Sequence, residues 1–341
     1  MSEFLDSLPK VELHVHVEGA VRPETALRLF RRYGAAEYDS EPAVRRLFTH
    51  DSFASFLAHY RCLCRAFRAP EDLELLAAEF VEDQAAQRIL YTEAILSPGA
   101  VRALCGIPAR EGLEAVLRGI AAGERACGVR VVLLLDLVRN LGLEEGWRIA
   151  ELALSRMGQG VVGITLGGDE TRFPAAPYAE LYQWARGWGL HTTAHAGEGA
   201  GPGSVWDCTQ KLGVERIGHG VRAIEDAALL EYLAEHKVPL ECCPTSNVAT
   251  GVVSDWPSHP VRALYDRHIP LSVSTDDPTL FGTTLSRELQ GLMDHHDFTA
   301  GEVGGIVRSA IDQSFLDPAG REGLHRQLDE YLASRRTAEE E

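Results

Sequence analysis

The sequence has no apolar run near the ~20 residues of a membrane span, and its first residues, MSEFLDSLPK, lack the features of a signal peptide. Cysteine is scarce as well. Seven cysteines are spread over 341 residues with no CxxC spacing, which excludes a regular disulfide framework. We therefore expect a soluble, cytoplasmic protein whose cysteines are free thiols in a reducing compartment.

Basic residues are also in deficit. Thirty-three Lys and Arg face 50 Asp and Glu, which gives a formal net charge of −17. Such a charge repels phosphate backbones and anionic lipids, so we expect neither nucleic acid nor a membrane as a partner. A small molecule is the expected partner, and the sequence does not indicate an oligomeric state.

Aromatic residues make up only 7% of the chain, whereas hydrophobic residues reach 45%. A core rich in Ala, Leu and Gly favours helices packed on a parallel sheet over a β-sandwich. No segment rich in Pro, Ser or Gly divides the chain. We therefore expect a single domain over residues 1–341.

Eight short apolar runs are separated by segments with helical periodicity, which predicts an α/β fold, a (β/α)8 TIM barrel. The runs are VELHVHV from 11, ILYTEAILS from 89, VRVVLLLDLV from 129, VVGITLGGDE from 161, LHTTAHAGE from 190, ERIGHGV from 215, VPLECCPTSN from 238 and IPLSVSTDDP from 269. The interval after the first run is long, so we expect extra helices inserted at about 20–88. The charged end, at about 334–341, is expected to be frayed.

Two histidines occupy alternate positions in the first run. In an extended chain His14 and His16 point to the same side, and two converging neutral imidazoles are suitable zinc ligands. The alternative is a pair of hydrogen-bonded core histidines. More ligands elsewhere in the chain are needed to favour the metal.

Further polar residues fall where later runs end. In such barrels the chemistry lies at the carboxyl ends of the strands, and the residues at these ends are His195, Glu198, His219, Asp276 and Asp277. Each has a simpler interpretation, as a core histidine, a loop carboxylate or a turn former before proline. Their joint occurrence favours a metal site.

Three imidazoles and one carboxylate, from His14, His16, His195 and Asp276, would hold one Zn²⁺ and leave a position for water. Zinc lowers the pKa of such a water toward ~7. His219 and Asp277 are placed to orient the water, and Glu198 is placed to donate a proton to the substrate.

The segments LPKVELHVHVEGAVRPETAL, LGGDE, HAGE, RIGHG, CPTSN and STDDP, in this order, resemble the adenosine deaminase family within the amidohydrolase superfamily. The resemblance spans roughly residues 8–290. It implies the same four zinc ligands and a reaction in which water replaces the 6-amino group of a purine and ammonia is released. The fourth run has no lysine, which favours one metal ion over two.

The resemblance also implies roles for single residues. Glu198 protonates the purine ring nitrogen beside the attacked carbon, and His219 and Asp277 hold the water. Asp277 also contacts the imidazole side of the purine, while the backbone of Gly168 binds the far ring nitrogen. Glu18, Gly168, Asp277 and His16 are therefore the expected substrate-binding residues.

Two positions depart from adenosine deaminases. Glu18 stands where they have an aspartate that contacts the ribose 5′-hydroxyl, and Ser274 replaces a common asparagine. Relatives with Glu at the first position act on adenine or on aminodeoxyfutalosine, a 5′-extended adenine nucleoside of menaquinone synthesis. We expect a 6-aminopurine nucleoside, adenosine or a 5′-modified adenosine, as the substrate. The alternatives are adenine deamination, another mononuclear hydrolase of this superfamily, and a barrel that binds purines without catalysis.

Overall fold

The computed structural model describes residues 3–50 and 53–340, and it leaves out the side chains of 53–54 and 336–340. Eight strands form one sheet in the order β1 to β8, and every neighbouring pair is parallel. The strands are β1 (Lys10–His16), β2 (Ile89–Leu96), β3 (Arg130–Asp136), β4 (Val161–Thr165), β5 (His191–Ala196), β6 (Arg216–His219), β7 (Leu240–Cys242) and β8 (Leu271–Val273).

The ring closes between β1 and the segment after β8. The amide of His16 donates to Asp276 O at 2.7 Å, and the amide of Asp276 donates to His14 O at 3.1 Å. The strands are buried along nearly their whole length, as expected when helices cover a parallel sheet. The predicted (β/α)8 barrel is confirmed, and its eight strands lie within the eight predicted runs, except that β1 begins one residue earlier, at Lys10.

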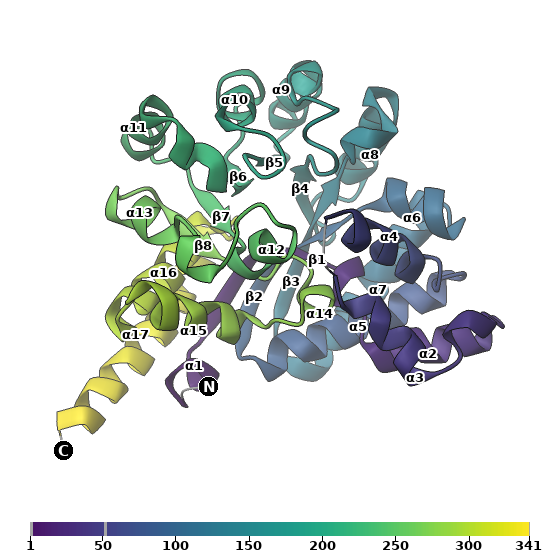
Figure 1. The fold of residues 1–341 in the computed structure, drawn as a ribbon, viewed down its shortest axis with the longest axis horizontal. Coiled ribbons are helices and arrows are strands. Elements are labelled where there is room, and N and C mark those ends of the chain that lie inside the picture. Colours follow the sequence, from purple (N-terminus) through teal and green to yellow (C-terminus); the bar gives the residue numbers. More distant parts are fainter. Residues whose placement is uncertain (1–2, 51–52, 341) are drawn as a thin grey trace.

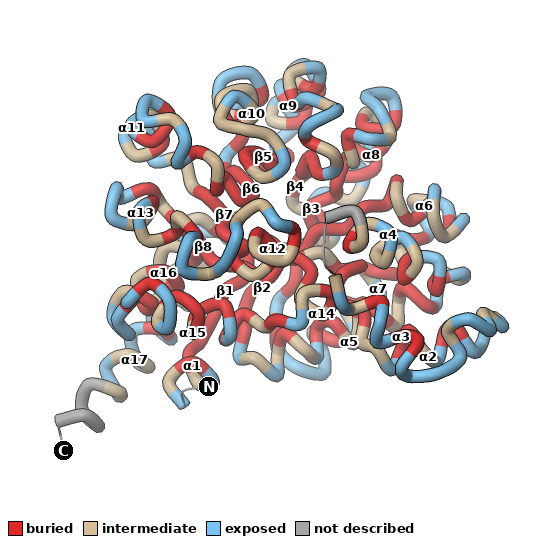
Figure 2. The backbone as a smooth tube through the Cα atoms, viewed as in Figure 1, coloured by how far each residue is buried: buried red, intermediate tan, exposed pale blue. Residues whose placement is uncertain are grey.

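Helices surround this barrel (Figure 1), and Figure 2 shows their exposed outer faces around buried strands. They are α1 (Glu3–Ser7), α2 (Pro23–Arg32), α3 (Glu41–Arg45), α4 (Phe53–Cys64), α5 (Pro70–Ala86), α6 (Pro98–Cys105), α7 (Ala109–Cys127), α8 (Leu143–Ser155), α9 (Ala179–Gly187), α10 (Pro202–Asp207), α11 (Ala227–Glu235), α12 (Pro244–Ala249), α13 (Val261–Asp266), α14 (Pro278–Phe281), α15 (Leu285–His296), α16 (Ala300–Gln313) and α17 (Pro318–Glu340).

The chain between β1 and β2 forms α2 to α5, which are the extra helices expected after the first strand. At the other end, α17 extends away from the barrel (Figure 1). The frayed tail is expected at 334–341. The side chains of 336–340 and residue 341 lie outside the part of the chain that the structure describes. In the part of the chain that is described, no helix combines the length and apolarity needed to cross a membrane.

Candidate metal and catalytic site

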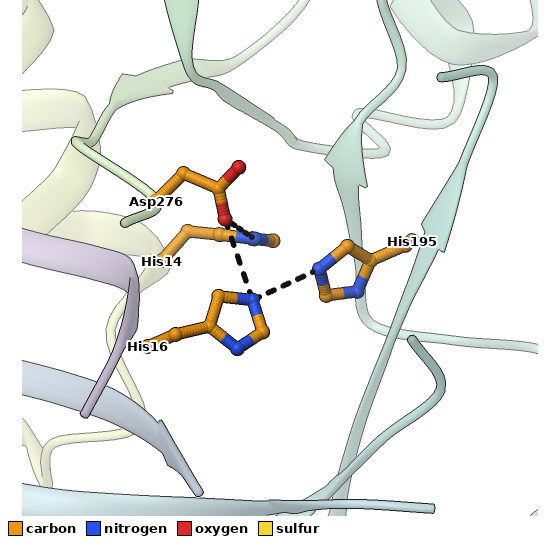
Figure 3. Close-up of side chains that lie close together, drawn as sticks. All are labelled: His14, His16, His195 and Asp276. Carbon is orange, nitrogen blue, oxygen red and sulfur yellow. Dashed lines mark hydrogen bonds and ion pairs between the residues drawn. The ribbon is translucent and has the colours of Figure 1, made fainter. Parts of the chain in front are cut away.

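Four side chains from three parts of the barrel converge at the carboxyl ends of the strands (Figure 3). His16 Nε2 lies 3.3 Å from both His195 Nε2 and Asp276 Oδ1, and His14 Nε2 lies 3.5 Å from Asp276 Oδ1. Tetrahedral zinc with bonds of ~2.1 Å places its ligand atoms roughly 3.4 Å apart. The spacing of these four side chains therefore suits one metal ion.

The hydrogen bonding of His14 supports this fit. Its Nδ1 lies 2.7 Å from Glu241 Oε2, whereas its Nε2 is buried and has no hydrogen-bond partner among the described residues. A ring that donates from Nδ1 presents the lone pair of Nε2 to the cluster. Gly218 is required beside this ring, because a Cβ there would lie 2.7 Å from His14 Cε1.

Asp276 is held in a strained but well-bonded position. Its backbone is left-handed, with φ of 64°, and Ser246 Oγ donates to its Oδ2 at 2.6 Å. The other oxygen, Oδ1, is left facing the histidines. His219, at the end of β6, is also left-handed with φ of 62°. Such conformations cost about 1–3 kcal/mol each and cluster at functional sites.

Glu198 and His219 lie beside the metal-binding cluster. His219 Nε2 is 3.6 Å from Glu198 Oε2 and 4.0 Å from Asp276 Oδ2. With Asn247 Nδ2 donating to Nδ1 of His219 at 3.2 Å, the ring proton lies on Nε2. Burial and the Asp276 and Glu170 carboxylates raise the pKa of Glu198, against the opposing effect of His219. A carboxyl with a raised pKa retains a proton that it can donate.

Glu170 fixes the loop that carries Glu198. Its carboxylate accepts hydrogen bonds from the amides of Gly197 at 2.6 Å, Glu198 at 3.1 Å and Ala200 at 3.0 Å. Three donors on one carboxylate leave the loop little freedom. The position of Glu198 is therefore set by a residue outside the cluster.

Asp277 and Glu18 each carry a buried oxygen without a partner among the described residues, Oδ1 and Oε2 respectively. Burial and the nearby Asp276 and Glu18 carboxylates raise the pKa of Asp277. Burial raises the pKa of Glu18 to about 7, although Ser97 N donates to its Oε1 at 2.8 Å. A Cβ on Gly19 would lie 1.7 Å from Asp277 Oδ1, so only glycine fits beside this carboxyl.

Gly168 is separate from the metal-binding cluster. It lines a groove of about 490 Å³ together with Glu198 and reaches its position through a left-handed backbone, with φ of 96°. The groove is also lined by Arg222 and by 250–252. Because Glu198 is one of the lining residues, the groove reaches the side chain that lies beside the cluster.

The supporting residues were not identified from the sequence. Ser246 and Asn247 belong to CPTSN and Glu170 belongs to LGGDE, so polar residues inside these motifs were the available signal. Glu241 had a different signal, a charged residue within the apolar run that forms β7. Ser274, the second departure, accepts from the amide of His14 at 3.1 Å and so supports the end of β1.

Known proteins resemble this chain over almost its whole length. The model of the adenosine deaminase family matches residues 9–331. An adenine deaminase of Sinorhizobium medicae is 37% identical over 93% of this chain and 97% of its own length. An aminodeoxyfutalosine deaminase of Streptomyces avermitilis is 33% identical over 98% of this chain and 94% of its own length.

Among solved structures, an amidohydrolase of Burkholderia ambifaria with bound zinc superposes with a TM-score of 0.89 at 27% identity. The match covers 97% of this chain and 93% of the other. The likeness therefore includes the barrel and the inserted helices together. The chain belongs to the adenosine deaminase family and is a hydrolytic deaminase of the aminopurine class.

Proposed function

We propose that this protein is a zinc-dependent hydrolytic deaminase of a 6-aminopurine nucleoside, either adenosine or a 5′-modified adenosine such as aminodeoxyfutalosine. The observation that carries the proposal is the convergence of three imidazoles and the Asp276 carboxylate beside Glu198 and His219. Seven free thiols support a reducing compartment such as the cytoplasm.

One zinc ion would be held by His14, His16, His195 and Asp276. When bound, zinc supplies a Lewis acid that makes water a nucleophile at neutral pH. The unpaired Nε2 of His14 and the close approach of two imidazole nitrogens, from His16 and His195, support this assignment.

The side chains around the cluster handle the protons. Glu198 donates a proton to the ring nitrogen beside the amino-bearing carbon, which makes that carbon electrophilic. His219 Nε2 and Asp277 Oδ1 hold the attacking water by hydrogen bonds on the side of the cluster. Water adds, the carbon–nitrogen bond breaks, and an oxopurine and ammonia are formed in equal amounts.

Two features bear on the substrate. The groove of about 490 Å³ beside Glu198 and Gly168 offers room beyond a bare base, which supports a nucleoside. The similarity to an aminodeoxyfutalosine deaminase also supports it. Free adenine is the second candidate, because Glu18 is only 2% exposed and an adenine deaminase is 37% identical.

The test is to mix zinc-loaded protein with adenine, adenosine and aminodeoxyfutalosine at equal low concentrations and to follow purine absorbance and ammonia. We expect the largest kcat/KM for one of the nucleosides. A larger value for adenine would contradict the nucleoside assignment. No ammonia from any of the three would contradict the proposed function.

A further inference from the structure

A network of charged side chains crosses the interior of the barrel and ends at the metal-binding cluster. Arg216, the first residue of β6, donates to Glu241 Oε1 and to Glu93 Oε2, both at 2.6 Å. Glu241 is the carboxylate whose Oε2 lies 2.7 Å from His14 Nδ1. Side chains of β2, β6 and β7 are thus joined to a metal-binding residue of β1.

The network of charged side chains is closed to water. Arg216, Glu93 and Glu241 are at most 1% exposed. Removing charges from water is costly unless each is paired and hydrogen-bonded, and breaking a buried pair is strongly destabilising. An arrangement held so tightly admits few alternative geometries for the carboxylate of Glu241.

On the side away from the metal-binding cluster, the network contacts the connection between α16 and α17. Arg216 Nη1 donates to Gln313 O at 2.9 Å, and the amide of Phe315 donates to Glu93 Oε1 at 2.5 Å. The guanidinium carbon of Arg216 lies 3.8 Å from the ring centroid of Phe315, which also stacks on His191 at 3.9 Å. The connection from Gln313 to Phe315 therefore anchors the buried charges.

We propose that Glu241 and Arg216 are positioning residues for the metal, which fix the orientation and tautomer of His14, and that Phe315 anchors them from the α16–α17 connection. The inference rests on the proposed function, because it requires a metal ion at the cluster. Glu241 accepts the Nδ1 proton of His14 and keeps Nε2 directed at the ion. Carboxylates in this position raise the basicity and fix the rotation of a ligating imidazole.

The first test is Glu241→Gln, which removes a charge but leaves Arg216 paired with Glu93. We expect zinc affinity, measured by competition with a chelator, to fall about 10- to 100-fold. The visible spectrum of the Co²⁺ form should change as well, because a neutral amide is a weaker acceptor for the Nδ1 proton of His14 than a carboxylate. Circular dichroism establishes that the variant is folded.

The matched control is Glu288→Gln, a second fully buried glutamate, which accepts from Thr245 N and bonds Thr283. It touches no residue of the cluster, so its zinc affinity and Co²⁺ spectrum should equal those of the wild type. Equal losses in the two variants would overturn the inference, since loss of any buried carboxylate would then explain the result.

Phe315→Leu tests the contact between the α16–α17 connection and the charged network, and it leaves every charge in place. We expect zinc affinity to fall roughly two- to tenfold with the same direction of spectral change. Unchanged affinity would overturn the role of the α16–α17 connection, and unchanged affinity in Glu241→Gln would overturn the whole inference. A wild type that binds no metal would overturn it too. A wild type that binds zinc but deaminates no aminopurine contradicts the proposed function alone. The order of zinc affinities among the wild type and the three variants still decides this inference.

Discussion

The mouth and the interior of the barrel both bury polar side chains, but among the described residues four that lie at the mouth keep an unpaired atom, whereas a charged group in the interior is fully bonded. His14 Nε2, His195 Nδ1, Glu18 Oε2 and Asp277 Oδ1 are buried without a partner among the described residues. In the interior, Glu93, Arg216 and Glu241 are bonded at every buried polar atom.

The difference has an energetic meaning. An unpaired buried polar atom costs about 1–3 kcal/mol, and the left-handed backbones of His219 and Asp276 add strain at the mouth. Such costs are tolerated where a ligand completes the bonding. Substitutions at the mouth should therefore remove activity with little loss of stability, whereas substitutions among the satisfied groups should alter stability.

The largest effect is expected for His16→Ala, which removes one side chain of the cluster. Zinc content should fall from one per chain toward zero, and kcat/KM should fall by a factor on the order of 10³ or more, since the metal supplies several kcal/mol. Metal analysis and initial rates measure both. A variant with full zinc and full activity would show that His16 is not a ligand.

Glu198→Gln should separate metal binding from turnover. The amide cannot donate the proton, so kcat should fall by about 10²–10⁴, while zinc content and the melting temperature stay at the wild-type values. Because burial raises the pKa of Glu198, the wild-type rate should decline on the alkaline side as this carboxyl ionises. Loss of zinc in the variant would instead make Glu198 a ligand.

Glu18→Gln should change selectivity more than rate. The carboxyl of Glu18 has one oxygen bonded to Ser97 N and one unpaired, so a substrate hydroxyl or amine is its natural partner. We expect the ratio of kcat/KM for adenosine to that for adenine to change by roughly 10- to 100-fold. An unchanged ratio would mean that Glu18 does not contact the group that distinguishes nucleoside from base.

The smallest effect is expected for Glu288→Gln, in the satisfied part of the fold. Burial raises the pKa of Glu288 to about 7 from its ordinary 4.5. The folded protein thus holds this proton more tightly than the unfolded chain does, and stability is lost as pH rises from 4.5 through 7. Between these pH values the free energy of unfolding of the wild type should fall by about 1–3 kcal/mol, and that of the variant should fall less. Melting temperatures measured across this range check both expectations. Parallel curves would contradict this.

Much of the fold was predictable because periodicity is a local property. Runs such as VVLLL, from residue 131, are apolar at every position, which is typical of strands covered on both faces. The grouping of His14, His16, His195 and Asp276 followed from one further rule, that parallel strands share one carboxyl end.

The supporting contacts were not predictable in this way. Glu241 and His14 are 227 residues apart, and Glu93 and Arg216 are 123 apart. Nothing in the local sequence says that a charge in an apolar run will meet its partner across the barrel. The distances between side chains in the folded structure are needed to see that Glu241 is bonded, whereas Glu18 keeps an unpaired oxygen among the described residues.

The sequence by itself determined the alternation of strands and helices, the residue types at the strand ends and the ordered motifs of the family. The tertiary structure decided which nitrogen of His14 faces the cluster, how deeply Glu18 is buried and what holds Asp276 in its left-handed conformation. The physical reason is that periodicity depends on neighbours along the chain. Orientation, burial and pKa depend on neighbours in space, which only the closed barrel brings together.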